Sequence, residues 1–216
     1  MPHPPLTAAE ARVVAALVEK SIATPAYYPM TVNALAAAAN QKTSRQPVMS
    51  LSEGEIGAAL NRLEELKLVA RDSFSARAQK WRHQFLHQML LKPQTQAILV
   101  TLMLRGPQTL AELRANAEGL GGPQDTDGLN AALQDLSDRA QPLVAPLARA
   151  PGQSASRWTH TLSGAPSEDE IHIPAPTPAD ATTDSVGERV TLASLTARVE
   201  ALEARLAGLE AALGGG

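Results

Sequence analysis

Two stretches of this chain, GEIGAALNRLEEL at 54–66 and DGLNAALQDLSD at 127–138, repeat one pattern of apolar residues. In both, the apolar residues recur after four and then three positions: Ile56, Leu60, Leu63 and Leu129, Leu133, Leu136. This spacing predicts an amphipathic helix with one buried face. Each helix is followed by a Trp-x-His segment, at 81–83 and at 158–160. The pattern therefore indicates two copies of one structural unit, each with an apolar face to bury.

The repeat extends upstream of these helices. ARVVAAL at 11–17 matches AILVTLM at 97–103, and NALAAAAN at 33–40 matches TLAELRAN at 109–116. Each copy is therefore predicted to contain three helices and then two strands, which is the element order of a winged-helix domain. Other helix-turn-helix variants share the three helices, but the closing hairpin favours the winged form. The predicted fold is mainly α with small β wings (α+β), in two tandem winged-helix domains.

The domain boundaries follow from where these patterns begin and end. We place winged-helix domain 1 at 1–88 and winged-helix domain 2 at 89–162. Residues 163–188 are rich in Pro, Ala, Thr and acidic side chains, and this composition predicts a disordered linker. The last segment, 189–213, is predicted to form a short C-terminal coiled coil.

The coiled-coil prediction rests on apolar residues that alternate between spacings of three and four: Leu192, Leu195, Val199, Leu202, Leu206, Leu209 and Leu213. With Leu192 at heptad position a, Arg198 and Arg205 fall at position g. In a parallel pair of helices they would meet Glu203 and Glu210 of the partner chain. We therefore predict a homodimer through this coil. Two alternatives stay open: a lone amphipathic tail helix, and a helix that docks on another protein.

Local signals set the predicted helix boundaries. Capping boxes, in which Ser or Thr precedes Glu by three residues, predict three helix starts: Thr7–Glu10, Ser52–Glu55 and Thr109–Glu112. Pro93 predicts a fourth helix start, and Gly106 with the following proline predicts the end of that helix. Asp125 or Thr126 is the expected cap of the last helix in the second copy.

Short strands are expected to close each copy. We place them near 68–73, 80–86, 143–149 and 156–162. Side chains alternate between the two faces of a strand, so Trp81, His83 and Phe85 are predicted to share one face of the second strand.

Composition limits the class of protein. The chain has 216 residues, no cysteine and 3% aromatic residues, so disulfides and thiolate metal sites are excluded and the cores must be aliphatic. No apolar run reaches membrane-spanning length and the N-terminus lacks a signal-peptide pattern, so we expect a soluble cytoplasmic protein. The net charge of −3 combines +3 for 1–88, zero for 89–165 and −6 for 166–216. The first domain is thus mildly basic.

The cations lie outside the helices that would normally read DNA. A DNA-binding winged helix places its third helix in the major groove, but both third helices here are rich in acidic residues. Positive charge gathers instead in the loop after the second helix and in the first wing. The expected nucleic-acid-binding residues, which would hold a phosphate backbone without reading sequence, are Gln41, Lys42, Thr43, Ser44, Arg45, Arg77, Lys80 and Arg82. The alternative is that Asn40 caps the second helix and the loop side chains bind local backbone groups.

No catalytic residue, cofactor site or metal site is predicted. The chain lacks a glycine-rich phosphate loop, and no Ser, His and acid arrangement can be placed. His83 and His87 are four residues apart, but no third ligand is close in sequence. His160 is the repeat equivalent of His83, so a shared structural role is expected for these two.

A run of motifs extends from Glu10 to Met49, and its most specific part is NQKTSR at 40–45. Further motifs follow in the second domain: LRGPQT at 104–109, LAR at 147–149 and SR at 156–157. Through these residues the chain resembles the YceH-like family of uncharacterised bacterial proteins, over about 6–164. The resemblance implies tandem winged helices. It implies no catalytic or ligand-binding residue, because the biochemical function of that family is not established.

Two binding functions follow as hypotheses. The first is a dimeric, DNA-associated regulatory protein, which the fold and the mildly basic first domain favour. The alternative is a protein–protein interaction or scaffold module that uses the acidic third helices without direct DNA contact. A continuous basic surface across loop 41–45 and wing 71–82 would favour duplex DNA, whereas broken basic patches would favour a protein partner.

Overall fold

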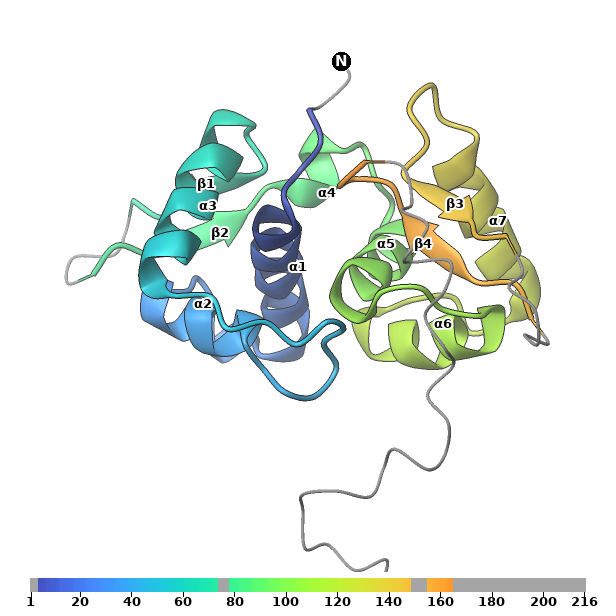
Figure 1. Cartoon of the computed structure of the whole chain (residues 1–216), viewed down its shortest axis with the longest axis horizontal. Helices are drawn as coiled ribbons and strands as arrows, with labels where there is room; N and C mark the ends of the chain where they lie inside the picture. The colour runs from blue at the N-terminus through green and yellow to red at the C-terminus, as the bar shows by residue number, and fades with distance from the viewer. Residues whose placement is uncertain (1–3, 74–77, 149–154, 165–216) are drawn as a thin grey trace, which may run out of the picture. The chain divides into compact units, whose positions relative to one another are not determined.

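The computed structural model of the protein describes residues 4–73, 78–148 and 155–164 (Figure 1). Almost all of the predicted linker at 163–188, and the whole predicted coiled coil at 189–213, lie outside the described residues.

Two winged-helix repeats follow one another along the described chain, as predicted. The first contains α1 (Ala8–Ala23), a 3-10 turn η1 (Pro25–Tyr27), α2 (Val32–Ala39), α3 (Glu53–Glu65), β1 (Val69–Arg71) and β2 (Trp81–His83). A short helix α4 (Phe85–Gln88) leads to the second, which contains α5 (Pro93–Arg105), α6 (Leu110–Ala117), η2 (Glu118–Leu120), α7 (Thr126–Ser137), β3 (Val144–Pro146) and β4 (Trp158–His160). Each strand pair is antiparallel, so each repeat ends in a small wing. The fold is therefore mainly α with small β wings.

The helices begin where the sequence signals place them. All three predicted capping boxes form: in each, the Ser or Thr side chain accepts from the backbone of the Glu, and that Glu accepts from the cap backbone in return. Asp125 caps α7, and its carboxylate accepts from the backbone N–H of Gly128 at 2.6 Å. Pro93 is the first residue of α5, and Gly106, at φ 70°, ends that helix.

The strands are shorter than predicted, and the prediction for Phe85 was wrong. In the first wing Val69 pairs with His83 and Arg71 pairs with Trp81. One more cross-strand bond follows, from the Gln84 N–H to the Leu68 carbonyl at 2.8 Å. The ladder stops there because the Leu68 N–H donates to the Leu63 carbonyl at 2.9 Å instead, and the second strand then turns into α4. Phe85 begins α4 and lies fully buried in the core, although it was expected on a strand.

In both wings a third segment of backbone pairs with the second strand, which the repeat in the sequence did not predict. Met30, between η1 and α2, exchanges two backbone hydrogen bonds with Trp81, of 2.8 and 3.1 Å. Gln108, between α5 and α6, does the same with Trp158, at 2.7 and 3.0 Å. Each tryptophan therefore joins the wing of its repeat to the segment between the first two helices.

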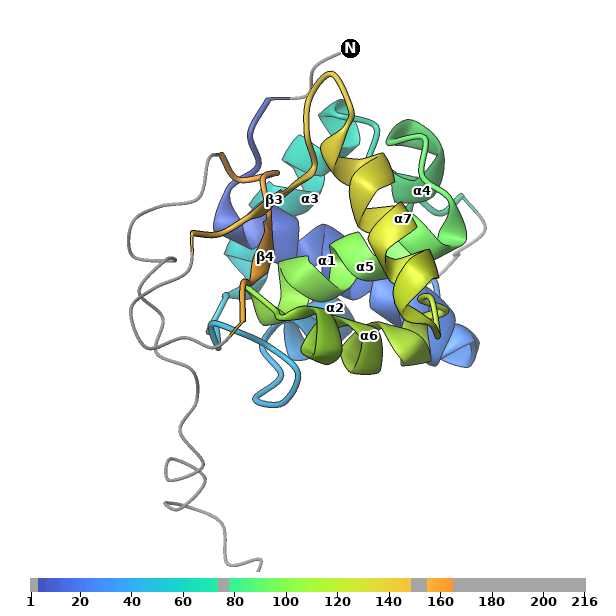
Figure 2. The ribbon, with the colours of Figure 1, turned by 90° about the vertical axis from the view of Figure 1, so that its right-hand side faces the viewer.

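The two repeats pack as one compact unit around α1 and α5. Figures 1 and 2 show these two helices side by side at the centre, and the buried apolar residues of both repeats form one cluster. Backbone hydrogen bonds also cross between the repeats: the Leu6 N–H donates to the Leu162 carbonyl at 2.7 Å, and the Gln46 N–H to the Leu104 carbonyl at 2.8 Å. The loop between α2 and α3 is therefore held by the second repeat as well as by its own.

Candidate functional site

The loop after α2, at 40–52, is closed by the side chain of Asn40. Its amide nitrogen donates to the Leu51 carbonyl, and its amide oxygen accepts from the Leu51 N–H, both at 2.8 Å. Asn40 is also the C-terminal cap residue of α2. It thus has the structural role considered for it as an alternative, and it draws the two ends of the loop together.

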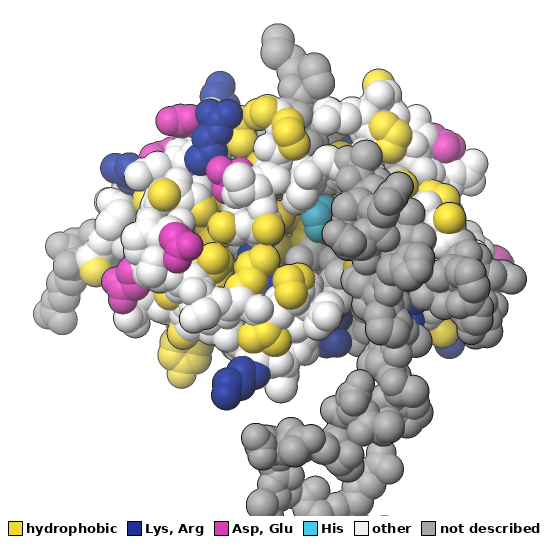
Figure 3. All heavy atoms as spheres, viewed as in Figure 1, with side chains coloured by type: hydrophobic (Ala, Val, Ile, Leu, Met, Phe, Trp, Pro, Cys, Tyr) yellow, Lys and Arg dark blue, Asp and Glu magenta, His cyan; other side chains and the backbone are white. Residues whose placement is uncertain are grey.

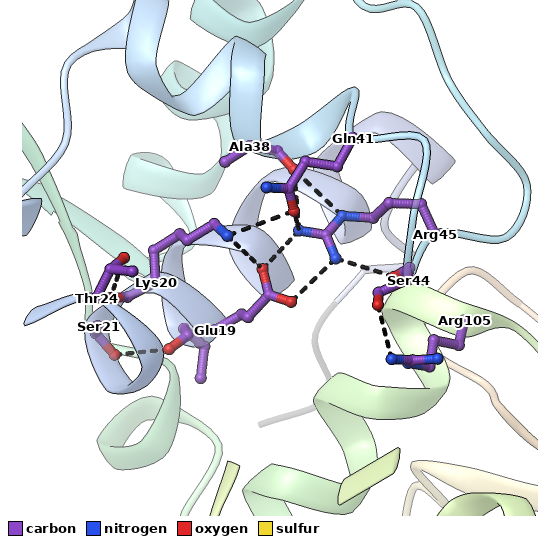
Figure 4. A network of polar contacts seen from close by, with 10 residues as sticks. Glu19, Lys20, Ser21, Thr24, Ala38, Gln41, Ser44, Arg45 and Arg105 are labelled. Carbon is purple, nitrogen blue, oxygen red and sulfur yellow. Dashed lines mark hydrogen bonds and ion pairs between the residues drawn. The ribbon is translucent and has the colours of Figure 1, made fainter. Parts of the chain in front are cut away.

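Arg45 lies beneath this loop, and Figure 4 shows its guanidinium at the centre of a polar network. The residue is 4% exposed. It donates to the Ala38 carbonyl at 2.9 and 3.2 Å, to the side chain of Gln41 at 2.9 Å and to the Ser44 carbonyl at 2.9 Å. Both carboxylate oxygens of Glu19 accept from it as well, one of them at 3.0 Å. Each guanidinium nitrogen is therefore occupied, so the structure gives Arg45 an internal role in place of the expected phosphate contact.

Glu19 supplies the negative charge of this network from α1. Burial raises the pKa of its carboxyl group, but the hydrogen bonds and positive charge of Arg45, together with Lys20, outweigh burial and lower the pKa overall. Lys20 lies 3.4 Å from the Glu19 carboxylate and donates to Gln41. The network therefore holds α1, α2 and the loop together as one charged, hydrogen-bonded unit.

The remaining loop residues divide between an exposed tip and an anchor. Lys42 and Thr43 are exposed, and the structure records no ion pair between Lys42 and a described residue. Ser44, at φ 60°, accepts through its hydroxyl from the guanidinium of Arg105 on α5 at 2.7 Å. The loop tip therefore presents Lys42, which is exposed and has no recorded ion pair to the described residues, while the base of the loop is fixed to the second repeat.

In the first wing, the described cations are largely paired with acids of their own repeat. Arg71 lies 3.2 Å from Glu64 of α3 and 5.1 Å from the centre of the Trp81 ring. Arg82 lies 3.7 Å from Asp72. Lys80 is half-buried without a recorded ion pair to the described residues, and the predicted contact Arg77 lies outside them. The described basic residues of the wing are thus partly neutralised by acids of their own repeat, and Lys80 keeps its charge without a recorded partner among the described residues.

The third helices of both repeats present exposed carboxylates, as their sequences indicated. On α3 these belong to Glu53, Glu55 and Glu65, and on α7 to Asp127 and Asp135, with Asp138 exposed at the C-terminal cap of that helix. Arg62 of α3 binds Glu65 at 2.7 Å, and Arg139 lies 3.3 Å from Asp135. Acidic side chains therefore outnumber the basic ones on both helices.

The histidines of the two wings are partly buried and uncharged at neutral pH. His83 bonds through Nε2 to the hydroxyl of Ser21 at 3.0 Å, and its backbone N–H donates to the Tyr28 hydroxyl at 2.6 Å. Burial, with a smaller effect of His87, lowers the pKa of His83 to about 4. Burial also lowers the pKa of His160 to about 4. Among the described residues, no three His, Asp or Glu side chains are grouped so that they could hold a metal ion.

A cavity that the sequence did not predict lies where the two repeats meet. Its walls include Arg12 and His160, each of which has a buried nitrogen without a hydrogen-bond partner. One signal could have identified Arg12: it is the only charged residue in the apolar run ARVVAAL, at a position that a helix buries. The cavity itself has no sequence signal, because its walls come from segments far apart in the chain.

No helix in the described part of the chain is both long and apolar enough to cross a lipid bilayer.

Comparison with known proteins identifies the family. A family model described as "Protein of unknown function, DUF480" matches residues 6–153. A UPF0502 protein of Delftia acidovorans is 44% identical over 214 residues, which cover 97% of this chain and 93% of the relative. UPF0502 proteins of Paraburkholderia phymatum (42% over 213 residues; 97% and 89% covered) and Azoarcus sp. (42% over 208 residues; 96% and 90%) are similar. None of these descriptions names an enzymatic activity. The matches confirm the resemblance to an uncharacterised bacterial family, and the chain belongs to the DUF480 family of UPF0502 proteins.

Proposed function

We propose that this protein is a non-catalytic binding module whose partner is another protein, contacted through the acidic surfaces of α3 and α7. The observation that carries this proposal is the row of exposed carboxylates on the helices that would otherwise enter a DNA groove. A partner that presents lysine and arginine side chains fits these surfaces by charge.

Electrostatics weigh against the usual docking of a winged helix on DNA. A carboxylate about 5 Å from a phosphate in water is repelled by about 0.8 kcal/mol. On α3, Glu53 and Glu55 have no recorded ion pair to a described residue, whereas Glu65 is paired with Arg62. Two such carboxylates would therefore oppose groove binding by about 1.6 kcal/mol, or roughly fifteenfold in affinity. The cations that could offset this repulsion, Arg71 and Arg82, lie beside carboxylates of their own repeat.

Duplex DNA is the second candidate, and one observation favours it. Lys42 and Thr43 are exposed at the loop tip, and Lys80 lies in the first wing without a recorded ion pair to the described residues. Such residues can contact phosphate without reading sequence. In this form the protein is a DNA-associated regulatory protein that grips the backbone beside the groove, and Arg45 and Gln41 only shape the loop.

The predicted coiled coil would increase the strength of either contact. A parallel dimer through the apolar residues at 192–213 would bring four winged-helix repeats together. Weak contacts made by linked copies combine into stronger overall binding. We therefore propose that the functional form is a homodimer.

The test compares both partner classes with the same set of variants. Glu53→Gln and Glu65→Gln together remove charge from α3, while Glu118→Gln removes an exposed charge from η2 and serves as the matched control. We expect crosslinked protein partners in the native cell to be lost in the α3 variant and retained in the control. We also expect no binding of mixed-sequence duplex DNA at low salt.

Salt-dependent DNA binding that disappears in a Lys42→Gln, Lys80→Gln double variant would replace the protein-partner proposal with the DNA one. Partners retained equally by the α3 variant and the Glu118→Gln control would also contradict it.

A further inference from the structure

A cavity of about 410 Å³ lies between the two repeats. Its walls come from α1 and the loop after α2 in the first repeat, and from the end of α5 and from β4 in the second. Figure 3 shows hydrophobic side chains gathered on the face that bears α1 and this loop, with a histidine at their edge. The volume lies within the range of about 300–1,000 Å³ that is typical of small-molecule sites. A small organic ligand would therefore fit, and it would touch both repeats.

Arg12 is the one charged residue among the cavity's wall residues, all of which are described. It is 1% exposed, and it donates to the carbonyls of Ala39 at 3.2 Å and Pro47 at 2.8 Å. Its Nε has no partner. Burial, and then repulsion by Arg45, lowers its pKa to about 10, so the guanidinium stays charged at neutral pH. The structure thus holds a buried cation beside an apolar cavity.

No described carboxylate compensates this charge. Glu19, the acid of the adjoining network, is bound by both Arg45 and Lys20. An ion removed from water without a counter-charge is unfavourable, and a well-placed opposite charge offsets much of that cost. An anion inside the cavity would supply the missing charge.

The second repeat adds a polar group to the cavity wall without adding charge. The Nδ1 of His160 is buried without a hydrogen-bond partner, and the ring is neutral at neutral pH. A neutral imidazole can donate or accept one hydrogen bond at each of its nitrogens. The rest of the lining is mostly apolar, with Ala11, Leu102 and Met103 as examples.

We propose that this cavity binds a small organic monocarboxylate, with its apolar body between α1 and α5 and its carboxylate facing Arg12. A doubly charged anion such as phosphate fits less well, because the described lining offers one cation and mostly apolar walls. A neutral apolar molecule would leave the guanidinium uncompensated. Because the ligand would contact both repeats, its binding would stabilise their junction, a role separate from the proposed docking of a protein on α3 and α7.

The probes are straight-chain monocarboxylates from butanoate to decanoate, together with benzoate. Each acid is paired with its neutral primary amide, which has nearly the same shape. We expect at least one acid to bind the full-length protein in calorimetry and to raise its melting temperature. The matching amide should bind roughly tenfold to a hundredfold more weakly, because it lacks the charged contact with Arg12.

Two variants locate the site without disturbing Arg12, whose loss could prevent folding. Ala8 is exposed at the start of α1 and lines the cavity, so Ala8→Trp should block the space and abolish acid binding. Ala58→Trp places the same side chain on an exposed position of α3 away from the cavity, and binding should be unchanged.

The proposal is overturned if no acid of the series binds, or if acid and amide bind equally well. Acid binding that persists in Ala8→Trp would also overturn it, since the site would then lie elsewhere.

Discussion

Replacement of Glu19 by Gln tests whether the network under the loop after α2 holds the first repeat together. Gln keeps the size of the side chain and one hydrogen-bond acceptor, but it leaves the guanidinium of Arg45 without a counter-charge. The Arg45 side chain is 0% exposed and that of Glu19 is 15% exposed, so solvent screens this pair weakly. Removal of one partner from a buried ion pair costs about 3–5 kcal/mol, and the partial exposure of Glu19 places this case at about 3 kcal/mol.

Urea and thermal unfolding at neutral pH provide the measurement. The described residues between 4 and 164 form one compact unit, and for a unit of this size each kcal/mol changes the melting temperature by about 2–4 °C. We therefore expect a decrease of about 6–12 °C. Glu64→Gln is the matched control, since it breaks a pair with Arg71 whose side chains are 37% and 53% exposed. That pair should contribute less than about 1 kcal/mol.

The pH dependence of the difference gives a second check with a definite sign. The folded-state pKa of Glu19 is depressed, so its stabilising contribution is present above the unfolded-state pKa of about 4.3. The contribution is lost as the pH falls through the folded-state pKa. The wild type and Glu19→Gln should therefore converge in acid. Equal losses for Glu19→Gln and Glu64→Gln at neutral pH would refute the structural role of the network.

Three further predictions concern other parts of the chain. Burial lowers the pKa of His160 from 6.5 to about 4, so protonation favours the unfolded chain below pH 6.5. Stability should fall by about 2 kcal/mol between pH 7 and pH 5 through this residue, and urea unfolding of His160→Phe should show a smaller decrease. Truncation after Ser163 should halve the mass per particle in light scattering, and equal masses for the two chains would exclude the coil as the dimer contact. A Cβ on Gly122 would lie 2.7 Å from the Cβ of Ala117, so Gly122→Ala should cost about 1–3 kcal/mol, whereas Gly119→Ala, with open space around it, should be near neutral in thermal unfolding.

The helices were predictable from the sequence because their signals are local. A capping box such as Thr7–Glu10 specifies a helix start through bonds between residues three apart, and the structure contains both bonds. The end of the second strand was not predictable, since its last cross-strand bond joins Gln84 to Leu68, sixteen residues earlier, whose own N–H is taken by Leu63. The alternation of side chains between two faces could be continued through Phe85, which predicted a strand there. Phe85 is instead buried in the core from the first position of α4.

The roles of the loop residues were not predictable for a related reason. Arg45 was grouped with Lys42 because both are cations in one polar run. Only the fold shows that Glu19, twenty-six residues earlier, lies within bonding distance of Arg45. The charges in the sequence therefore predicted a polar loop. They could not distinguish the buried Arg45, which is paired with Glu19, from the exposed Lys42.

The two repeats share the same order of helices and strands, but the connection before the third helix differs in length. This difference in length contributes to the cavity. Eight residues (118–125) join α6 to α7, and they turn tightly at Gly121, at φ 80°. Thirteen residues (40–52) join α2 to α3 in the first repeat.

The longer connection lets the first-repeat loop reach the second repeat, where the Gln46 N–H binds the Leu104 carbonyl. The same loop contributes Gln46, Pro47 and Met49 to the cavity wall. The extra residues therefore form both the inter-repeat contact and part of the cavity, so a ligand held there would act on a loop that contacts both repeats. Shortening this loop to the length of its counterpart would remove the contact with Leu104 and the loop's part of the cavity wall together, and would leave α1 as the first repeat's remaining contribution to that wall.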